Sequence, residues 1–272
     1  MIGTSLLEEL VQATALTHRV KGFGHVGLLL LAAPESGKTT ITTAAHAKHV
    51  QPVAVFSGRS IVREMHDNPA CEFFLFNDLT AIRAMSAQAV ALCIVLLNQI
   101  TQGERGKVGF AGKDTEQIDR MMGVIGCLPF TTFVDHRSKW QHLGFISRMI
   151  PFAYAYPDAL VAEIKDHVDA GTHVPTTRPR QRLPRPPRHP LTVTMTADLT
   201  RRVRSLADIK SRALGQLGIR LLKNYHCLIR AHALLAHRRH VTAADLDFLK
   251  AVDAFVSVTQ CRPLTHNGHM IP

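Results

Sequence analysis

One short segment of the chain combines the residue types that hold phosphate. Gly37, Lys38 and Thr39 stand together directly after the apolar residues 26–31. A loop of this kind can wrap backbone N–H groups around a phosphate, while the lysine offers a mobile cation and the threonine hydroxyl a ligand to Mg²⁺. The apolar strand before the loop and the helix expected after it favour nucleotide binding over a chance G-K-T on a turn.

The loop departs from the usual phosphate-binding motif at its first position, where Ala32 replaces a glycine. An alanine is expected to reshape the start of the loop, because it lacks the backbone freedom of glycine. The residues expected to contact ATP are Pro34, Glu35, Ser36, Gly37, Lys38, Thr39 and Thr40.

A second motif consists of four apolar residues, 73–76, followed by Asn77 and Asp78. A carboxylate at the carboxyl end of such a strand can hold Mg²⁺ opposite Thr39, so Asp78 is the candidate for this Walker B role. The alternative is an ordinary turn acid. Leu79 follows where a water-orienting glutamate is usual, so hydrolysis is slow or uses another base. Glu104 is the first candidate for that base, and Glu72 is the second.

Short apolar segments alternate with longer segments of helical composition through the first part of the chain. Strands are expected over 26–31, 53–56, 72–76 and 123–128, and helices over 4–19, 39–49 and 81–99. This alternation predicts an α/β core, a parallel sheet covered by helices on both faces. After residue 190 the pattern changes to helices over 196–206, 214–236 and 243–255.

The composition divides the chain into four parts. Residues 1–171 form the expected phosphate-loop core, 172–190 a linker rich in proline and arginine, 191–261 a small helical lid and 262–272 a tail. The net charge is +11, and an excess of this size favours contact with nucleic acid. The linker arginines could follow a nucleic-acid backbone or belong to a solvated connector.

The remaining composition indicates a cytoplasmic protein that does not enter a membrane. The five cysteines are scattered without a C-x-x-C pair, which suggests neither a disulfide framework nor a zinc site. The longest wholly apolar run, 89–97, has nine residues, whereas a membrane span needs about 20.

The order of these motifs resembles that of an AAA+ ATPase of the MCM and MoxR-like branch. The segment 144–151 is similar to the L-x-S-R-F signature of that branch, and the resemblance implies that Arg148 reaches the γ-phosphate of a neighbouring subunit. It further implies that Arg220, with Lys223 in reserve, is a sensor arginine of the lid, and that Thr131 follows the sensor strand. Each of these cations could instead be a surface charge.

The resulting expectation is an ATPase that binds ATP and Mg²⁺ between subunits of a ring or filament and acts on DNA. Thr39 and Asp78 are its expected metal ligands, and Asp78, Arg148 and Glu104 its expected catalytic residues. One alternative is a nucleotide-gated assembly or adaptor protein that turns over little ATP and recruits a partner enzyme. Another is a small-molecule kinase, which would need no arginine from a neighbour.

Overall fold

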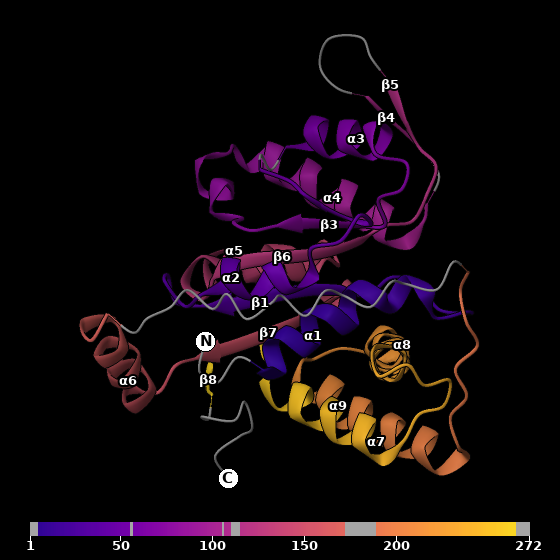
Figure 1. The fold of residues 1–272 in the computed structure, drawn as a ribbon. Coiled ribbons are helices and arrows are strands. Elements are labelled where there is room, and N and C mark those ends of the chain that lie inside the picture. Colours follow the sequence, from indigo (N-terminus) through magenta and orange to yellow (C-terminus); the bar gives the residue numbers. More distant parts are fainter. Residues whose placement is uncertain (1–4, 55–56, 105, 110–114, 172–188, 265–272) are drawn as a thin grey trace.

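A six-stranded parallel sheet forms the centre of the computed structural model (Figure 1), which describes residues 5–54, 57–104, 106–109, 115–171 and 189–264. The order of its strands is β2-β3-β6-β1-β7-β8, and every neighbouring pair is parallel. The strands are β1 Gly27–Ala32, β2 Val50–Pro52, β3 Phe73–Phe76, β6 Gly123–Pro129, β7 Met149–Ala155 and β8 Arg262–Pro263.

Continuous apolar strands form this sheet because both of its faces are covered. Leu28 and Leu30 of β1 belong to one hydrophobic cluster, and Leu29 and Leu31 belong to another on the opposite face. Successive side chains of a strand point to opposite faces, so an alternating polar pattern would leave one of these clusters incomplete.

Two sets of helices cover the two faces, giving three layers (Figure 1). Buried side chains of the first set join the cluster of Leu28 and Leu30. Its members are α1 Ser5–Leu16, α2 Lys38–Thr42, α7 Ala197–Ala213, α8 Ile219–Leu235 and α9 Ala243–Phe255. The second set packs on the opposite face. Its members are α3 Gly58–Asp67, α4 Ala87–Gln102 and α5 Phe130–His142.

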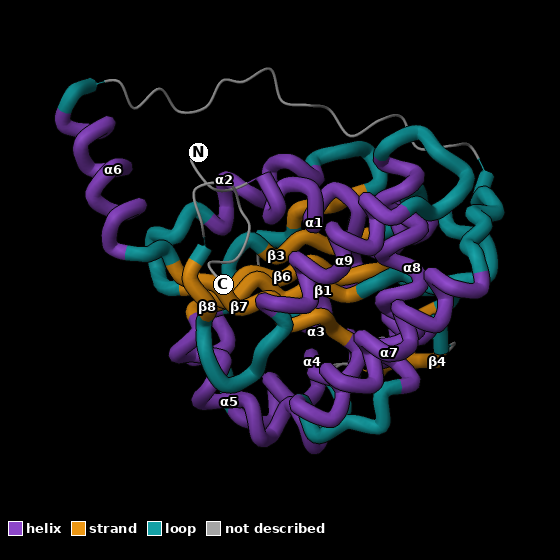
Figure 2. Tube along the Cα trace, turned by 90° about the horizontal axis from the view of Figure 1, so that it is seen from below, coloured by secondary structure: helices purple, strands orange, loops and turns teal. Residues whose placement is uncertain are grey.

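Smaller elements connect these layers. The 3₁₀ helices are η1 Thr17–Arg19, η2 Thr43–Ala45, η3 Thr80–Ala84 and η4 Ile146–Arg148. An antiparallel hairpin pairs β4 Gly106–Gly109 with β5 Thr115–Ile118. Helix α6, Asp158–Asp169, extends away from the layers in both Figure 1 and Figure 2. Within the described ranges, none of the helices combines the length and apolar character that a membrane span requires.

The α/β core with its parallel sheet is confirmed. Two predicted elements next to the loop 33–37, which we call the phosphate loop after its expected role, differ from the prediction. The helix predicted over 39–49 ends at Thr42 and continues only as the turn η2. Threonines at 39, 40, 42 and 43 explain this end, because β-branched side chains lose rotamer freedom in a helix. The strand predicted over 53–56 forms earlier as β2, where Val50 pairs with Phe73; residues 55–56 lie outside the described residues.

The C-terminal helices form near their predicted positions and share a core with the sheet. Side chains of α7, α8 and α9 lie in the same hydrophobic cluster as β1 and β7. Residues 172–188, which hold the predicted linker's arginines, lie outside the described residues, as do 265–272. The first residues of the predicted tail form β8, where Arg262 pairs with Tyr154.

Candidate nucleotide site

The phosphate loop leaves the carboxyl end of β1 in a tight, partly left-handed path. Ala32 is the last residue of the strand, fully buried and paired with Pro129 of β6. The loop therefore begins after the position where the usual motif has its first glycine. Glu35 and Gly37 have φ angles of 60° and 70°, a region that costs a residue with a side chain roughly 1–2 kcal/mol.

The Lys38 side chain folds back over this loop. Its Nζ donates to the Ala33 carbonyl at 2.6 Å, to the Ser36 hydroxyl at 3.0 Å and to the Ala32 carbonyl at 3.2 Å. Burial lowers the pKa of Lys38, while Cys127 and Asp78 act in the opposite direction. The ammonium group thus sits over the loop, within electrostatic reach of Asp78.

Five further predicted contacts lie at the same carboxyl edge of the sheet. Thr39 and Thr40 are exposed in the first turn of α2, and Thr131 is exposed in the first turn of α5. Pro34 and Glu35 are also exposed on the loop. These residues surround the end of β1, because parallel strands bring their carboxyl ends to one edge.

Asn77 joins the phosphate loop to the second motif, a role that sequence analysis missed. The Thr42 hydroxyl of α2 lies 2.9 Å from Asn77 Oδ1 and 2.9 Å from the Thr39 carbonyl, and it can donate to either. Asn77 is the first residue after β3. A polar residue directly after an apolar strand is the sequence signal for this contact, but the signal does not distinguish Asn77 from the charged Asp78 beside it.

Asp78 lies one residue further along, exposed at this edge. Its two carboxylate oxygens accept from the Thr80 amide and the Thr80 hydroxyl, each at 2.8 Å. A hydroxyl and a carboxylate are the oxygen ligands that Mg²⁺ prefers, so Thr39 and Asp78 fit this metal in chemistry and in the edge they share.

Leu79 does not face the site. Its side chain is buried in the cluster with α4 and α5, and its amide donates to the Cys127 carbonyl at 2.9 Å. A Cβ added to Gly126 would lie 2.8 Å from Leu79 Cδ1, which shows how closely the leucine packs on β6. A glutamate at this position would be buried rather than directed at a phosphate.

The predicted catalytic residues Arg148 and Glu104 lie at the opposite, amino edge of the sheet. Arg148 immediately precedes β7, whose first residue pairs with Gly27 at the start of β1. Glu104 follows α4, whose end contacts the start of β6 through the Met122 amide and the Ile100 carbonyl. The six residues of β1 separate the two edges by roughly 20 Å. Neither residue is near Lys38 of its own chain.

Arg220 joins this second group. Its guanidinium donates to the Ser147 hydroxyl at 3.0 Å and to the Gln102 side chain at 3.3 Å. Arg148 donates to the Gly144 carbonyl at 2.6 Å. Burial lowers the pKa of Arg148, the charge of Arg220 lowers it further, and Glu104 opposes them. Two arginines and one acid therefore form a cluster on the amino edge, which we call the arginine face: Arg148, Arg220 and Glu104.

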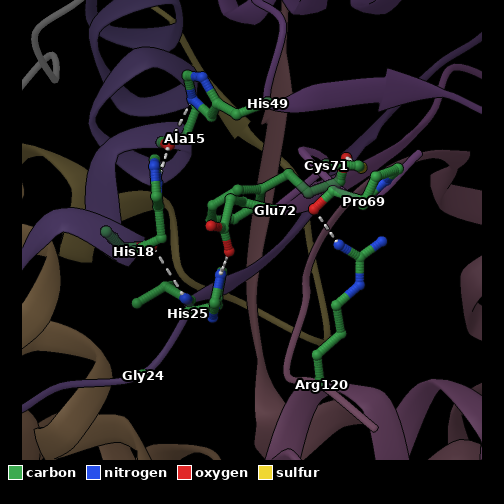
Figure 3. Close-up of polar contacts among 12 residues, drawn as sticks. Ala15, His18, Gly24, His25, His49, Pro69, Cys71, Glu72 and Arg120 are labelled. Carbon is green, nitrogen blue, oxygen red and sulfur yellow. Dashed lines mark hydrogen bonds and ion pairs between the residues drawn. The ribbon is translucent and has the colours of Figure 1, made fainter. Parts of the chain in front are cut away.

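Glu72, the second candidate for a base, is also at the amino edge. Its carboxylate lies 3.0 Å from His25 Nε2, beside His18 and His49 (Figure 3). The rings of His18 and His49 are 4.6 Å apart. Because Glu72 precedes β3 and is held by His25, it does not reach the phosphate loop.

The sequence matches no family model and no curated protein.

Proposed function

We propose that this chain is an ATPase of the AAA+ type that binds ATP and Mg²⁺ at the carboxyl edge of its sheet. The observation that carries the proposal is that Lys38 and Thr39 begin α2, directly after the tight loop that follows β1, with Asp78 at the same edge. The lysine would exchange its loop carbonyls for phosphate oxygens, and the bound metal would neutralise charge on the phosphates.

The site is completed by a second copy of the chain. Arg148 and Arg220 lie together on the amino edge, from which neither reaches Lys38 of the same chain. Arg148 is partly buried, and its guanidinium donates to a backbone carbonyl rather than to a carboxylate within the described residues. A head-to-tail contact would bring the arginine face to the neighbour's phosphate loop, and repetition of that contact gives a ring or a filament. A guanidinium there would stabilise charge on the transferred phosphoryl group.

We propose that the ATPase binds and acts on nucleic acid, with DNA as the first polymer to test. Its support is the net charge of +11, because neutralising phosphates releases counterions and drives binding. Binding that weakens steeply as salt concentration rises would agree with this part of the proposal, and salt-independent binding would contradict it.

An adaptor with little turnover is the second candidate. It is favoured by the burial of Leu79 and by the distance of Glu104 and Glu72 from the loop. Asp78 is the carboxylate whose charge opposes the burial that lowers the pKa of Lys38. In this version ATP binding promotes assembly and recruits a partner enzyme, while hydrolysis is slow. The partner would recognise the assembled form.

The test is MgATP binding by calorimetry, followed by steady-state turnover with and without DNA. Lys38→Ala should abolish binding, while the exposed Lys48→Ala on the same segment should bind as the unaltered chain does. DNA-stimulated turnover supports the ATPase, and binding with negligible turnover supports the adaptor. No binding by the unaltered chain would overturn both.

Asp78→Asn separates the two roles open to that carboxylate. If Asp78 holds the metal, the variant should lose the dependence of ATP affinity on Mg²⁺. If it orients water, the variant should bind MgATP normally and lose turnover.

A further inference from the structure

Two tyrosines contact the phosphate loop, one within β7 and one directly after it. The Tyr154 hydroxyl donates to the Ser36 carbonyl at 3.2 Å, and the Tyr156 hydroxyl donates to the same oxygen at 3.1 Å. A carbonyl oxygen has two lone pairs, so it can accept both bonds at once. The loop is thereby tied to the strand on the far side of β1 from Asp78.

This contact fixes the orientation of one peptide group. The structure has no cis peptide bonds among its described residues, and in a trans peptide the carbonyl and the following N–H point in opposite directions. Holding the Ser36 carbonyl toward Tyr154 and Tyr156 therefore turns the Gly37 N–H away from them. Gly37 precedes Lys38, so this donor lies in the part of the loop that meets phosphate.

The two tyrosines, which we call the β7 anchor, pack against each other. Tyr154 is fully buried, and its ring centroid lies 6.1 Å from that of Phe152 and 6.0 Å from that of Tyr156. Burial raises the pKa of Tyr156 to about 12 and that of Tyr154 higher still. Both phenols therefore keep their protons at neutral pH and remain donors.

The loop has a reason to need external support. Ala32 belongs to the strand, and Glu35 holds a left-handed conformation that its side chain disfavours. Ser36 is buried, and its two oxygens have separate partners: the carbonyl accepts from the tyrosines and the hydroxyl accepts from Lys38. One residue thus links the β7 anchor to the cation of the site.

We propose that Tyr154 and Tyr156 are positioning residues for phosphate binding, which hold the Ser36–Gly37 peptide so that the Gly37 N–H is presented to a nucleotide phosphate. This inference rests on the proposed nucleotide site and adds a specific device to it. The device acts on phosphate recognition and not on the adenine base.

The test compares Tyr154→Phe, Tyr156→Phe and the double variant by calorimetric titration with MgATP, MgADP and AMP. The double variant should bind ATP and ADP about tenfold more weakly, because two bonds of ordinary strength orient the peptide. The ratio of ATP to AMP affinity should fall by the same factor. The amide resonance of Gly37 should lose part of the shift that nucleotide causes in the unaltered chain.

The third tyrosine supplies the matched control. The Tyr225 hydroxyl donates to Asp253 in the helical layer at 2.5 Å, so Tyr225→Phe removes a buried hydroxyl without touching the loop. It should lower the melting temperature and leave the ATP-to-AMP ratio unchanged. Tyr156 is only half-buried, so its single variant keeps the test usable if the double variant does not fold.

The outcomes separate this inference from the proposed function. Unchanged ATP affinity in folded Tyr154→Phe and Tyr156→Phe would overturn the anchor and leave the ATPase proposal standing. An equal loss in Tyr225→Phe would also overturn it, because general destabilisation would then explain the effect. An unaltered chain that binds no ATP would remove both proposals.

Discussion

Three consecutive residues at the carboxyl edge have different surroundings and therefore different chemistry. Asn77, Asp78 and Leu79 are consecutive, yet the first faces α2, the second is exposed and the third is buried against β6. Residue type and order indicated an acid near the phosphate loop, but not which neighbours faced it. That information depends on the local turn after β3, which short sequence patterns do not fix.

Introducing at position 79 the glutamate that is usual in the Walker B motif should therefore destabilise the fold rather than raise ATP turnover. Leu79→Glu places a carboxylate in a closed hydrophobic cluster, and we expect a loss of about 3 kcal/mol or more in the free energy of unfolding. Urea denaturation at neutral pH measures this loss.

The control is Leu92→Glu, at a leucine that is 42% exposed on α4. It should change stability by about 0.5 kcal/mol or less. Faster ATP turnover in Leu79→Glu, with unchanged stability, would contradict the structure at this position.

At the scale of elements, continuous apolar strands were predictable and interrupted ones were not. The strands at 26–31, 72–76 and 123–128 appear as β1, β3 and β6, because buried parallel strands need apolar residues on both faces. Strand β7 was not predicted. Pro151 lies inside it, and a proline within an apolar run argues against an inner strand.

Helix starts were easier to predict where a cap was present. The helix predicted over 243–255 forms as α9, and Thr242 is its N-cap residue in a capping box. The Asp245 carboxylate accepts from the Thr242 amide at 2.7 Å, from Arg238 at 2.6 Å and from His232 Nδ1 at 2.7 Å. This carboxylate is fully buried, so it links α8, the following turn and α9.

Asp245→Asn should accordingly be among the most damaging single changes in the helical layer. Loss of the negative charge removes the buried ion pair of Arg238 and one of the two ion pairs of His232, which keeps Glu9 at 3.7 Å, and we expect a cost of about 3 kcal/mol. Chemical denaturation should show it, whereas Asp247→Asn, at an exposed Lys250 pair, should cost about 0.5 kcal/mol or less. Equal losses in the two variants would show that the buried network around Asp245 contributes no more to stability than an exposed ion pair.

At the scale of the whole molecule, a histidine cluster couples folding to acidity (Figure 3). Burial, followed by the charges of His49, Arg19 and His25, lowers the pKa of His18 to about 2. Burial also lowers the pKa of His49. Within the described residues, no group of three or more His, Cys, Asp or Glu could hold a metal ion.

The free energy of unfolding should fall as pH drops below about 6.5, the unfolded value for histidine. Because the folded pKa of His18 and His49 is depressed, the unfolded chain binds more protons in this range and acid favours it. The slope should be about 1 kcal/mol per pH unit for each histidine that stays neutral. His232 opposes this trend, because its folded pKa is raised.

Urea denaturation between pH 5 and pH 8 measures the slope. His18→Leu should make it shallower, and the exposed His240→Asn should leave it unchanged. A His18→Leu variant with the same slope as the unaltered chain would show that this cluster is not the source.

Under the proposed ATPase mechanism, the separation of the arginine face from the phosphate loop predicts complementation between inactive chains. Arg148→Ala and Lys38→Ala should each lower ATP turnover by about a thousandfold or more. Mixed in equal amounts, they should recover about a quarter of normal turnover, because a quarter of head-to-tail contacts would pair an intact loop with an intact arginine.

Turnover of the mixture, measured against each variant alone, checks this expectation. The exposed Arg239→Ala serves as the charge control and should retain normal turnover. A mixture as inactive as its components would place the whole site within one chain and remove the arginine face from the mechanism.

Packing of the first helix against a late one also sets the order in which the chain can fold during synthesis. Nine of the twelve residues of α1 are buried, and the helix packs against α8, which begins at Ile219. At roughly 5–20 residues per second, the ribosome makes α8 some ten to forty seconds after α1. Throughout that interval the residues of α1 that pack on α8 lack their final partner, so we expect this part of α1 to stay exposed on the nascent chain until α8 is made.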